Sequence, residues 1–220
     1  MKEALLLFSL VASANAAVFL PITDIAVNMT SGNTGSNPLS NIIEGAGSGF
    51  DGSAPHVQTG GTWYTDAPGG FPSDYISANP GSEYIWLNLG SDVLLTEISY
   101  WGYSDDNANG MREFNLSFAT GAEGGTATLG DESYGASITA NPSFTALQAS
   151  SPRQSFSFAP VTAQFVRIEA TSTFFGQAGA GAGGDRLGIG EIAFENIPEP
   201  STSLMAVLGA VCLLRRKRMS

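Results

Sequence analysis

The 220-residue sequence predicts an all-β sandwich, and three observations lead to this prediction. Segments with the two-residue alternation of strands recur through the body of the chain, turn-forming residues separate them, and no long window carries a helical stripe. With 43% hydrophobic residues the chain has enough apolar side chains for one core, but it is too short for two large domains. We therefore expect a single sandwich domain.

Strands and the loops between them are predicted throughout residues 22–195. The alternation is clearest where Phe114, Leu116 and Phe118 share one face of a strand. Between the first strand and Glu83 lie more than 50 residues rich in Gly, Ser, Pro and Asn, a length that indicates a functional loop or one ordered by a bound group. Segment 176–184, with five Gly and three Ala, predicts a second, flexible loop. The strands are predicted at 22–29, 83–89, 94–103, 113–119, 154–158, 163–170 and 189–195.

Acidic residues dominate the body of the chain. Residues 18–197 hold four arginines against 18 acidic side chains, a formal charge of −14. So few cations cannot neutralise a run of phosphates, which excludes nucleic acid as a partner. The acidity suits a divalent cation, although a solvated acidic surface on an exported protein is the simpler interpretation. The single cysteine, Cys212, excludes an intramolecular disulfide and a cysteine-based zinc site.

The N-terminus has the composition of a targeting signal. Lys2 precedes the apolar stretch 4–12, and Ala14, Asn15 and Ala16 match the small-x-small pattern that signal peptidase cleaves. Residues 1–16 are therefore predicted to be a secretory signal peptide. The alternative is an uncleaved anchor, but the apolar run is shorter than the roughly 20 residues that span a membrane.

The C-terminus carries three elements in a fixed order. Pro198, Glu199 and Pro200 precede 11 apolar residues at 204–214, and the basic cluster 215–218 follows. This order resembles the PEP-CTERM sorting signal of Gram-negative bacteria. The resemblance implies that residues 198–220 enter the inner membrane transiently as a short hydrophobic helix and are removed by an exosortase. The domain between the two signals, 17–197, would then reach the cell surface or the extracellular polysaccharide matrix; an accidental hydrophobic tail is the alternative.

Six segments of the body carry a second resemblance. They are NIIEG (41–45), TWYT (62–65), EYIWLNLGS (83–91), LTEI (95–98), FVRI (165–168) and IGEI (189–192). In this order they resemble the discoidin family, the type C domains of coagulation factors V and VIII and their bacterial carbohydrate-binding relatives. The resemblance implies a jelly-roll β-sandwich of the galactose-binding-like kind, with ligand loops at one end. The disulfide that ties the termini of many members is absent here, and Glu44 stands where Asp is common.

The same resemblance implies a structural Ca²⁺ ion. Matched onto this chain, the ligands are Glu44, Thr62 and Glu191, with Asp51 as a substitute candidate. Oxygen ligands from distant segments, together with carbonyls of a Gly-rich loop, are what Ca²⁺ requires. The alternative is a loop without an ion, in which Glu191 forms a salt bridge with an arginine.

A sugar site is implied on the same grounds. The family's relatives use an aromatic platform beside His, Arg or Asn donors, because a pyranose has an apolar face and hydroxyl edges. His56, Trp63, Trp101 and Arg112 lie in or beside predicted loops and supply these groups. The alternative is that the two tryptophans pack in the core or at its rim and that His56 is simply exposed.

These patterns predict an exported, non-catalytic carbohydrate-binding protein whose partner is an extracellular polysaccharide or another glycan. A structural or adhesive matrix protein without a specific ligand is the second hypothesis. The third is a polysaccharide hydrolase that uses Asp105 and Asp106 as paired carboxylates, but adjacent residues in a turn point apart. With one His and no Gly-x-Ser-x-Gly pattern, the sequence suggests no nucleophile and base pair.

Overall fold

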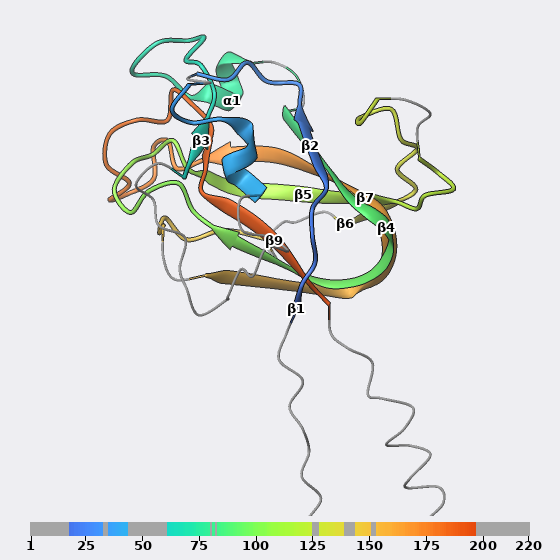
Figure 1. Ribbon diagram of the computed structural model, residues 1–220. Helices are drawn as coiled ribbons and strands as arrows, with labels where there is room; N and C mark the ends of the chain where they lie inside the picture. Colours follow the sequence, from blue (N-terminus) through green and yellow to red (C-terminus); the bar gives the residue numbers. More distant parts are fainter. Residues whose placement is uncertain are drawn as a thin grey trace, which may run out of the picture. The chain divides into compact units, whose positions relative to one another are not determined.

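The computed structural model describes residues 18–32, 35–43, 61–79, 81, 83–124, 128–138, 144–150 and 153–196. They belong to one compact unit, Val18–Ile197 (Figure 1). The predicted signal peptide at 1–16, the sorting signal at 198–220, and Glu44, Asp51 and His56 lie outside the described residues. In the part of the chain that is described, no helix has the length and apolar character needed to cross a membrane.

Two long strands run through both layers of the molecule. β4 (Glu83–Trp101) and β7 (Gln154–Thr173) are antiparallel partners over most of their length. Their register shifts between Asn88 and Val93 and again between Leu95 and Glu97, and irregularities of this kind bend a strand pair. Figure 1 shows both strands curving back at this bend. Each strand therefore contributes one half to each layer.

The layers are antiparallel throughout. One contains the first half of β4, the second half of β7, and the strands β2 (Asp24–Val27), β5 (Met111–Ala119) and β6 (Ala136–Ile138). The other contains the second half of β4, the first half of β7, and the strands β1 (Val18–Phe19) and β9 (Glu191–Asn196). A small separate sheet pairs β3 (Trp63–Tyr64) with β8 (Gly188–Ile189). This architecture confirms the predicted all-β sandwich.

The core lies between the two layers. Ile85 and Leu87 of β4 are fully buried, while the residues that alternate with them are half-buried on the outer face. On β5, Phe114 stacks on Phe144 with ring centroids 5.4 Å apart and meets Phe156 edge to face at 5.6 Å. Pairs with this geometry add to the stabilisation from apolar burial. The alternation that the sequence predicted for β5 is confirmed.

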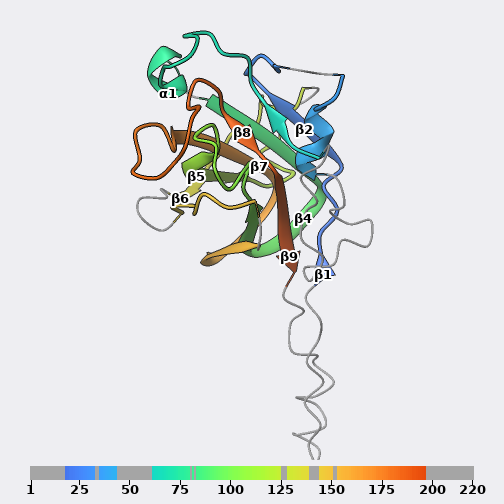
Figure 2. The ribbon, with the colours of Figure 1, turned by 90° about the vertical axis from the view of Figure 1, so that its left-hand side faces the viewer.

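Because β4 and β7 curve back at the bend, the start and the end of each strand lie at the same end of the sandwich. Segments 102–110 and 174–187 follow the ends of β4 and β7, and 144–150 precedes β7. Segment 65–74 leads from β3 into the short helix α1 (Tyr75–Ala78), whose first residue, Tyr75, is hydrogen-bonded to Gly184. This helix lies among the loops, as Figure 2 shows. We call this part of the molecule the loop end. It positions the candidate site.

The first and last strands of the domain pair with each other away from the loop end. Val18 of β1 lies opposite Asn196 of β9, and Phe19 lies opposite Glu195. β9 begins beside Trp101, at the end of β4, and runs from there toward the bend. The two ends of the described domain are therefore direct neighbours.

Candidate functional site

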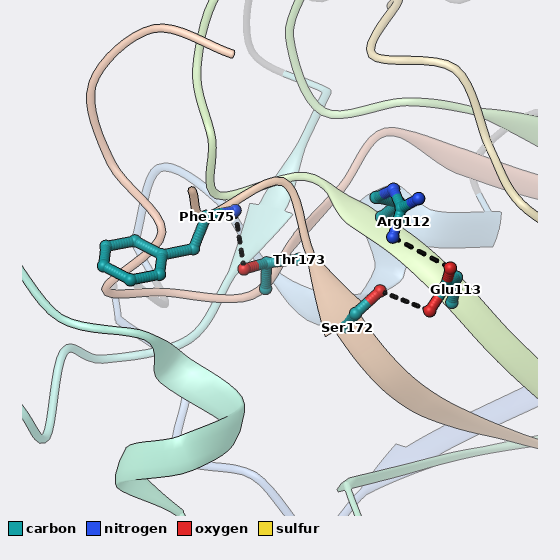
Figure 3. Close-up of polar contacts among 5 residues, drawn as sticks. All are labelled: Arg112, Glu113, Ser172, Thr173 and Phe175. Atoms are coloured by element: carbon teal, nitrogen blue, oxygen red, sulfur yellow. Dashed lines mark hydrogen bonds and ion pairs between the residues drawn. The ribbon is translucent and has the colours of Figure 1, made fainter. Parts of the chain in front are cut away.

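A break in the strand register places a charged pair at the loop end. Met111 of β5 lies opposite Thr173 of β7, but the register shifts on both sides of Glu113, and such bulges redirect side chains. Nη1 of Arg112 donates to Oε1 of Glu113 at 2.8 Å, and both side chains are 26% exposed. Ser172 Oγ donates to the other carboxylate oxygen at 3.1 Å (Figure 3). The pair presents charged hydrogen-bonding groups to solvent.

An aromatic ring lies just beyond the end of β7. Phe175 is 38% exposed, and its backbone N–H donates to Thr173 Oγ1 at 3.2 Å. Figure 3 shows the ring directed away from the strand. The ring packs against the backbone at Gly184, where an added Cβ would lie 2.5 Å from ring atom Cδ2. Phe175 is therefore held in place while part of its ring stays accessible.

Side chains fix the backbone of the glycine-rich loop 174–187. Oδ1 of the buried Asn109 accepts from the N–H of Gly184 at 2.6 Å and of Arg186 at 3.3 Å. Gln148 Nε2 donates to the carbonyl of Ala180 at 2.6 Å. At Gly181, with φ of +71°, a Cβ would collide with the carbonyl oxygen of Asp106. The glycines of this loop thus permit a specific conformation.

Helix α1 is attached to the same loop. The N–H of Tyr75 donates to the carbonyl of Gly184 at 2.7 Å, and the Tyr75 side chain is 2% exposed. Its hydroxyl donates to Glu83 Oε2 at 3.4 Å. Burial raises the pKa of Tyr75, so the phenol remains a neutral donor, and burial also raises the pKa of the Glu83 carboxyl. These contacts hold the segment before α1 beside the Phe175 loop.

The structure places the predicted sugar-site residues in different environments. Trp63 and Trp101 are both fully buried, and Trp63 Nε1 donates to Ser31 Oγ at 2.9 Å. A ring without exposed surface cannot stack on a sugar, so their assignment to an aromatic platform is corrected: both pack in the core. Arg112 does lie at the loop end, as described above. His56 stays a prediction because it lies outside the described residues.

Two groups of the candidate site were missed by the sequence prediction, namely Phe175 and Glu113. Phe175 belongs to an aromatic pair that stands between the last strand positions of β7 and the glycine-rich segment. An aromatic residue just outside a strand, next to glycines, is a signal that could have identified it. Glu113 was assigned only to a strand, and its pairing with Arg112 depends on the bulge.

The predicted calcium ligands can be followed in part. Thr62 is 6% exposed, and its carbonyl accepts from the amides of Asn37 at 2.8 Å and of Asn41 at 3.0 Å. The 3₁₀ helix η1 (Leu39–Ile43) contains Asn41, ends one residue before Glu44, and packs against β9. Glu191, at the start of β9, is 2% exposed. Among the described residues, no three His, Cys, Asp or Glu side chains converge as a metal site.

The carboxylates of the hydrolase hypothesis have separate partners. Oδ1 of Asp105 accepts from the backbone N–H of Ser150 at 2.7 Å and from its hydroxyl at 2.9 Å. Oδ1 of Asp106 accepts from Ser104 Oγ at 3.1 Å. Asp105 therefore joins two loops of the loop end, and this contact gives it a structural role.

Comparison with known proteins bears on the fold. No protein-family model matches the chain, and no curated protein matches it. Among solved structures, the CBM32-1 and CBM32-2 domains of Clostridium perfringens ZmpB match with a TM-score of 0.51 at 13% identity, covering 82% of this chain and 38% of that chain. The domain has the fold of these modules. CBM32 denotes family 32 of the carbohydrate-binding modules. The same ZmpB domains in complex with GalNAc match with a TM-score of 0.49 at 14% identity, covering 80% of this chain and 33% of that chain.

A single module of this kind matches over almost its whole length. It is the family 32 module of C. perfringens NanJ in complex with galactose, with a TM-score of 0.47 at 17% identity, covering 82% of this chain and 99% of that chain.

Proposed function

We propose that this protein is a non-catalytic carbohydrate-binding domain that holds its ligand at the loop end. The observation that carries the proposal is the accessible, fixed ring of Phe175 at the end of β7, next to the strand position that bears Arg112 and Glu113. An aromatic ring can stack on the apolar face of a pyranose, while the guanidinium donates to sugar hydroxyls and the carboxylate accepts from them. The fold it shares with carbohydrate-binding modules supports the proposal.

The polar contacts of the loop end support binding without catalysis. A glycosidase needs two carboxyl groups on either side of the scissile bond, about 5 to 9.5 Å apart. Here Glu113 is paired with Arg112, and Asp105 accepts two hydrogen bonds from Ser150. Each carboxylate thus has a structural partner, and Glu113 keeps further lone pairs that can accept from sugar hydroxyls.

Replacing Phe175 with alanine is expected to weaken glycan binding at least tenfold, because an aromatic anchor at the centre of a site carries much of its binding energy. Binding would be measured on an array that includes galactose and N-acetylgalactosamine, and by pull-down on native exopolysaccharide. Thermal unfolding should change little, since the ring is 38% exposed.

Leu94→Ala is the matched control for this test. Leu94 is 42% exposed but lies within β4, paired with Thr162 of β7 near the bend. Its variant should bind like the unmodified protein. A folded protein that binds no glycan would overturn the proposal and leave the structural matrix protein as the remaining hypothesis.

A structural Ca²⁺ ion is part of the proposal, with Glu44, Thr62 and Glu191 as ligands. Two contacts support this set of ligands. The helix η1, which ends one residue before Glu44, packs on β9. β3, which follows Thr62, pairs with β8, which ends two residues before Glu191. Glu191 provides a carboxylate at the start of β9, and carboxylate oxygens are preferred Ca²⁺ ligands. Bound Ca²⁺ would hold the long loop against the sandwich.

We further propose that the protein is exported by way of the signal peptide and carried to the surface of a Gram-negative bacterium after exosortase removes the C-terminal signal. Both cleavage positions lie outside the paired residues of β1 and β9, so processing would leave those strands intact. Mass spectrometry of the surface protein should give a chain that starts at Ala17 and ends near Pro198, Glu199 and Pro200. Peptides containing Cys212 in the surface pool would contradict the second cleavage.

A further inference from the structure

Two more apolar side chains project from the loop end. Phe71 is 67% exposed and Leu147 is 71% exposed, which makes them the most exposed large hydrophobic side chains among the described residues. Neither belongs to the site proposed above. Exposed apolar side chains that gather in one region commonly mark a binding surface.

Both residues lie on loops that are hydrogen-bonded to the loop of Phe175. On one side, Gln148, which follows Leu147, donates to the carbonyl of Ala180 at 2.6 Å. On the other side, the N–H of Tyr75 donates to Gly184 at 2.7 Å, and Gly184 packs against the Phe175 ring. The Phe175 loop is therefore hydrogen-bonded to both of the other loops, at Ala180 and at Gly184. We call Phe71, Phe175 and Leu147 the apolar row.

The Leu147 loop also connects to the charged pair. The N–H of Ala146 donates to the carbonyl of Arg112 at 2.7 Å, so the row and the Arg112–Glu113 pair share one set of loops. A single sugar unit that stacks on Phe175 and reaches this pair would leave the more exposed members, Phe71 and Leu147, without a function. A longer ligand would use all three.

Charge determines which long ligand fits. Residues 18–197 have a formal charge of −14, and each of their four arginines has a partner in the described structure. Arg112 is paired with Glu113 and Arg153 with Glu195. Arg167 lies between the rings of Tyr84 and Tyr134, and Arg186 donates to the Thr65 carbonyl at 2.8 Å. A uronic acid polymer or an anionic lipid surface would be repelled by this net negative charge.

We propose that the loop end binds a neutral oligosaccharide of several units, with Phe175 contacting a central unit and Phe71 and Leu147 contacting the flanking units. This inference rests on the proposed function and adds the class and the length of its ligand. The flanking contacts are apolar and exposed, so they contribute affinity only when the chain extends beyond the central unit.

Calorimetric titration of the full-length protein with galactose and with galacto-oligosaccharides of two to five units tests the proposal. Affinity should rise about tenfold from the monosaccharide to the longest oligosaccharide. Phe71→Ala and Leu147→Ala should each remove about threefold of that gain and leave galactose binding unchanged. Phe175→Ala should weaken both ligands, and Leu94→Ala should weaken neither.

Equal affinity for galactose and its oligomers, or no effect of Phe71→Ala and Leu147→Ala on the oligomers, would overturn the inference while the proposed function stands. Tighter binding of uronate oligomers, or of vesicles that contain anionic phospholipid, would overturn the choice of a neutral glycan. A folded protein that binds none of the sugars would overturn both this inference and the proposed function.

Discussion

Replacing Trp63 with alanine is expected to lower the free energy of unfolding by about 3–5 kcal/mol, the usual cost of removing a large aromatic side chain from a core. Trp63 is fully buried, and its indole N–H donates to Ser31 Oγ at 2.9 Å. The variant would lose apolar burial, leave a cavity and deprive Ser31 of its partner. Chemical denaturation monitored by circular dichroism would measure the change.

Two further variants make this prediction sharper. Trp63→Phe keeps most of the apolar volume and should fall between the alanine variant and the unmodified protein. Phe71→Ala removes an aromatic side chain that is 67% exposed and should change stability by less than about 0.5 kcal/mol. A loss below about 1 kcal/mol for Trp63→Ala would show that the tryptophan is not part of the core.

Removal of Ca²⁺ is expected to produce the second large effect. An ion that binds only the folded state stabilises it by about 2.7 kcal/mol at a hundredfold excess over Kd. For a domain of this size, that corresponds to a fall in Tm of roughly 5 to 10 °C when chelator replaces millimolar Ca²⁺. Differential scanning calorimetry in the two buffers would measure it.

The variant Glu191→Gln should reduce the difference between the two buffers, because it removes a charged ligand from the proposed site. Glu169→Gln is the matched control: Glu169 accepts from Asn115 Nδ2 at 3.2 Å on the outer face of the other layer, and its variant should respond to chelator like the unmodified protein. Identical melting curves with chelator and with Ca²⁺ would contradict the site.

The fold class could be predicted from alternation alone, but the course of β4 and β7 could not. The sequence suggests two strands in place of each, because Gly90 and Pro160 look like breaks. In the structure, Gly90 adopts a φ of +81° within β4, and pairing resumes at Val93. A bulge and a turn have similar composition, and only the pairing with a partner strand distinguishes them. The sequence does not show directly which residues pair with one another.

The candidate site was predictable only in part, for a related reason. Arg112 was identified by its residue type and its place beside a loop. The tryptophans have the right chemistry, but burial depends on which segments cover them, and Trp101 lies beside Glu191 and Phe19 from distant parts of the chain. The ring of Phe175 is held in place by its contact with Gly184, and local periodicity in the sequence cannot reveal such a contact.

The pairing of Val18 with Asn196 has a practical consequence for protein engineering. Partners across an antiparallel ladder have Cα atoms about 4.5 to 5.5 Å apart. A linker of a few residues could therefore join the two ends of the sandwich, and new ends could be opened elsewhere in a circular permutant. For the same reason the sandwich could be inserted into a surface loop of a host protein with little strain on the host. Its loop end would then point away from the junction, since β1 and β9 meet on the side of the bend.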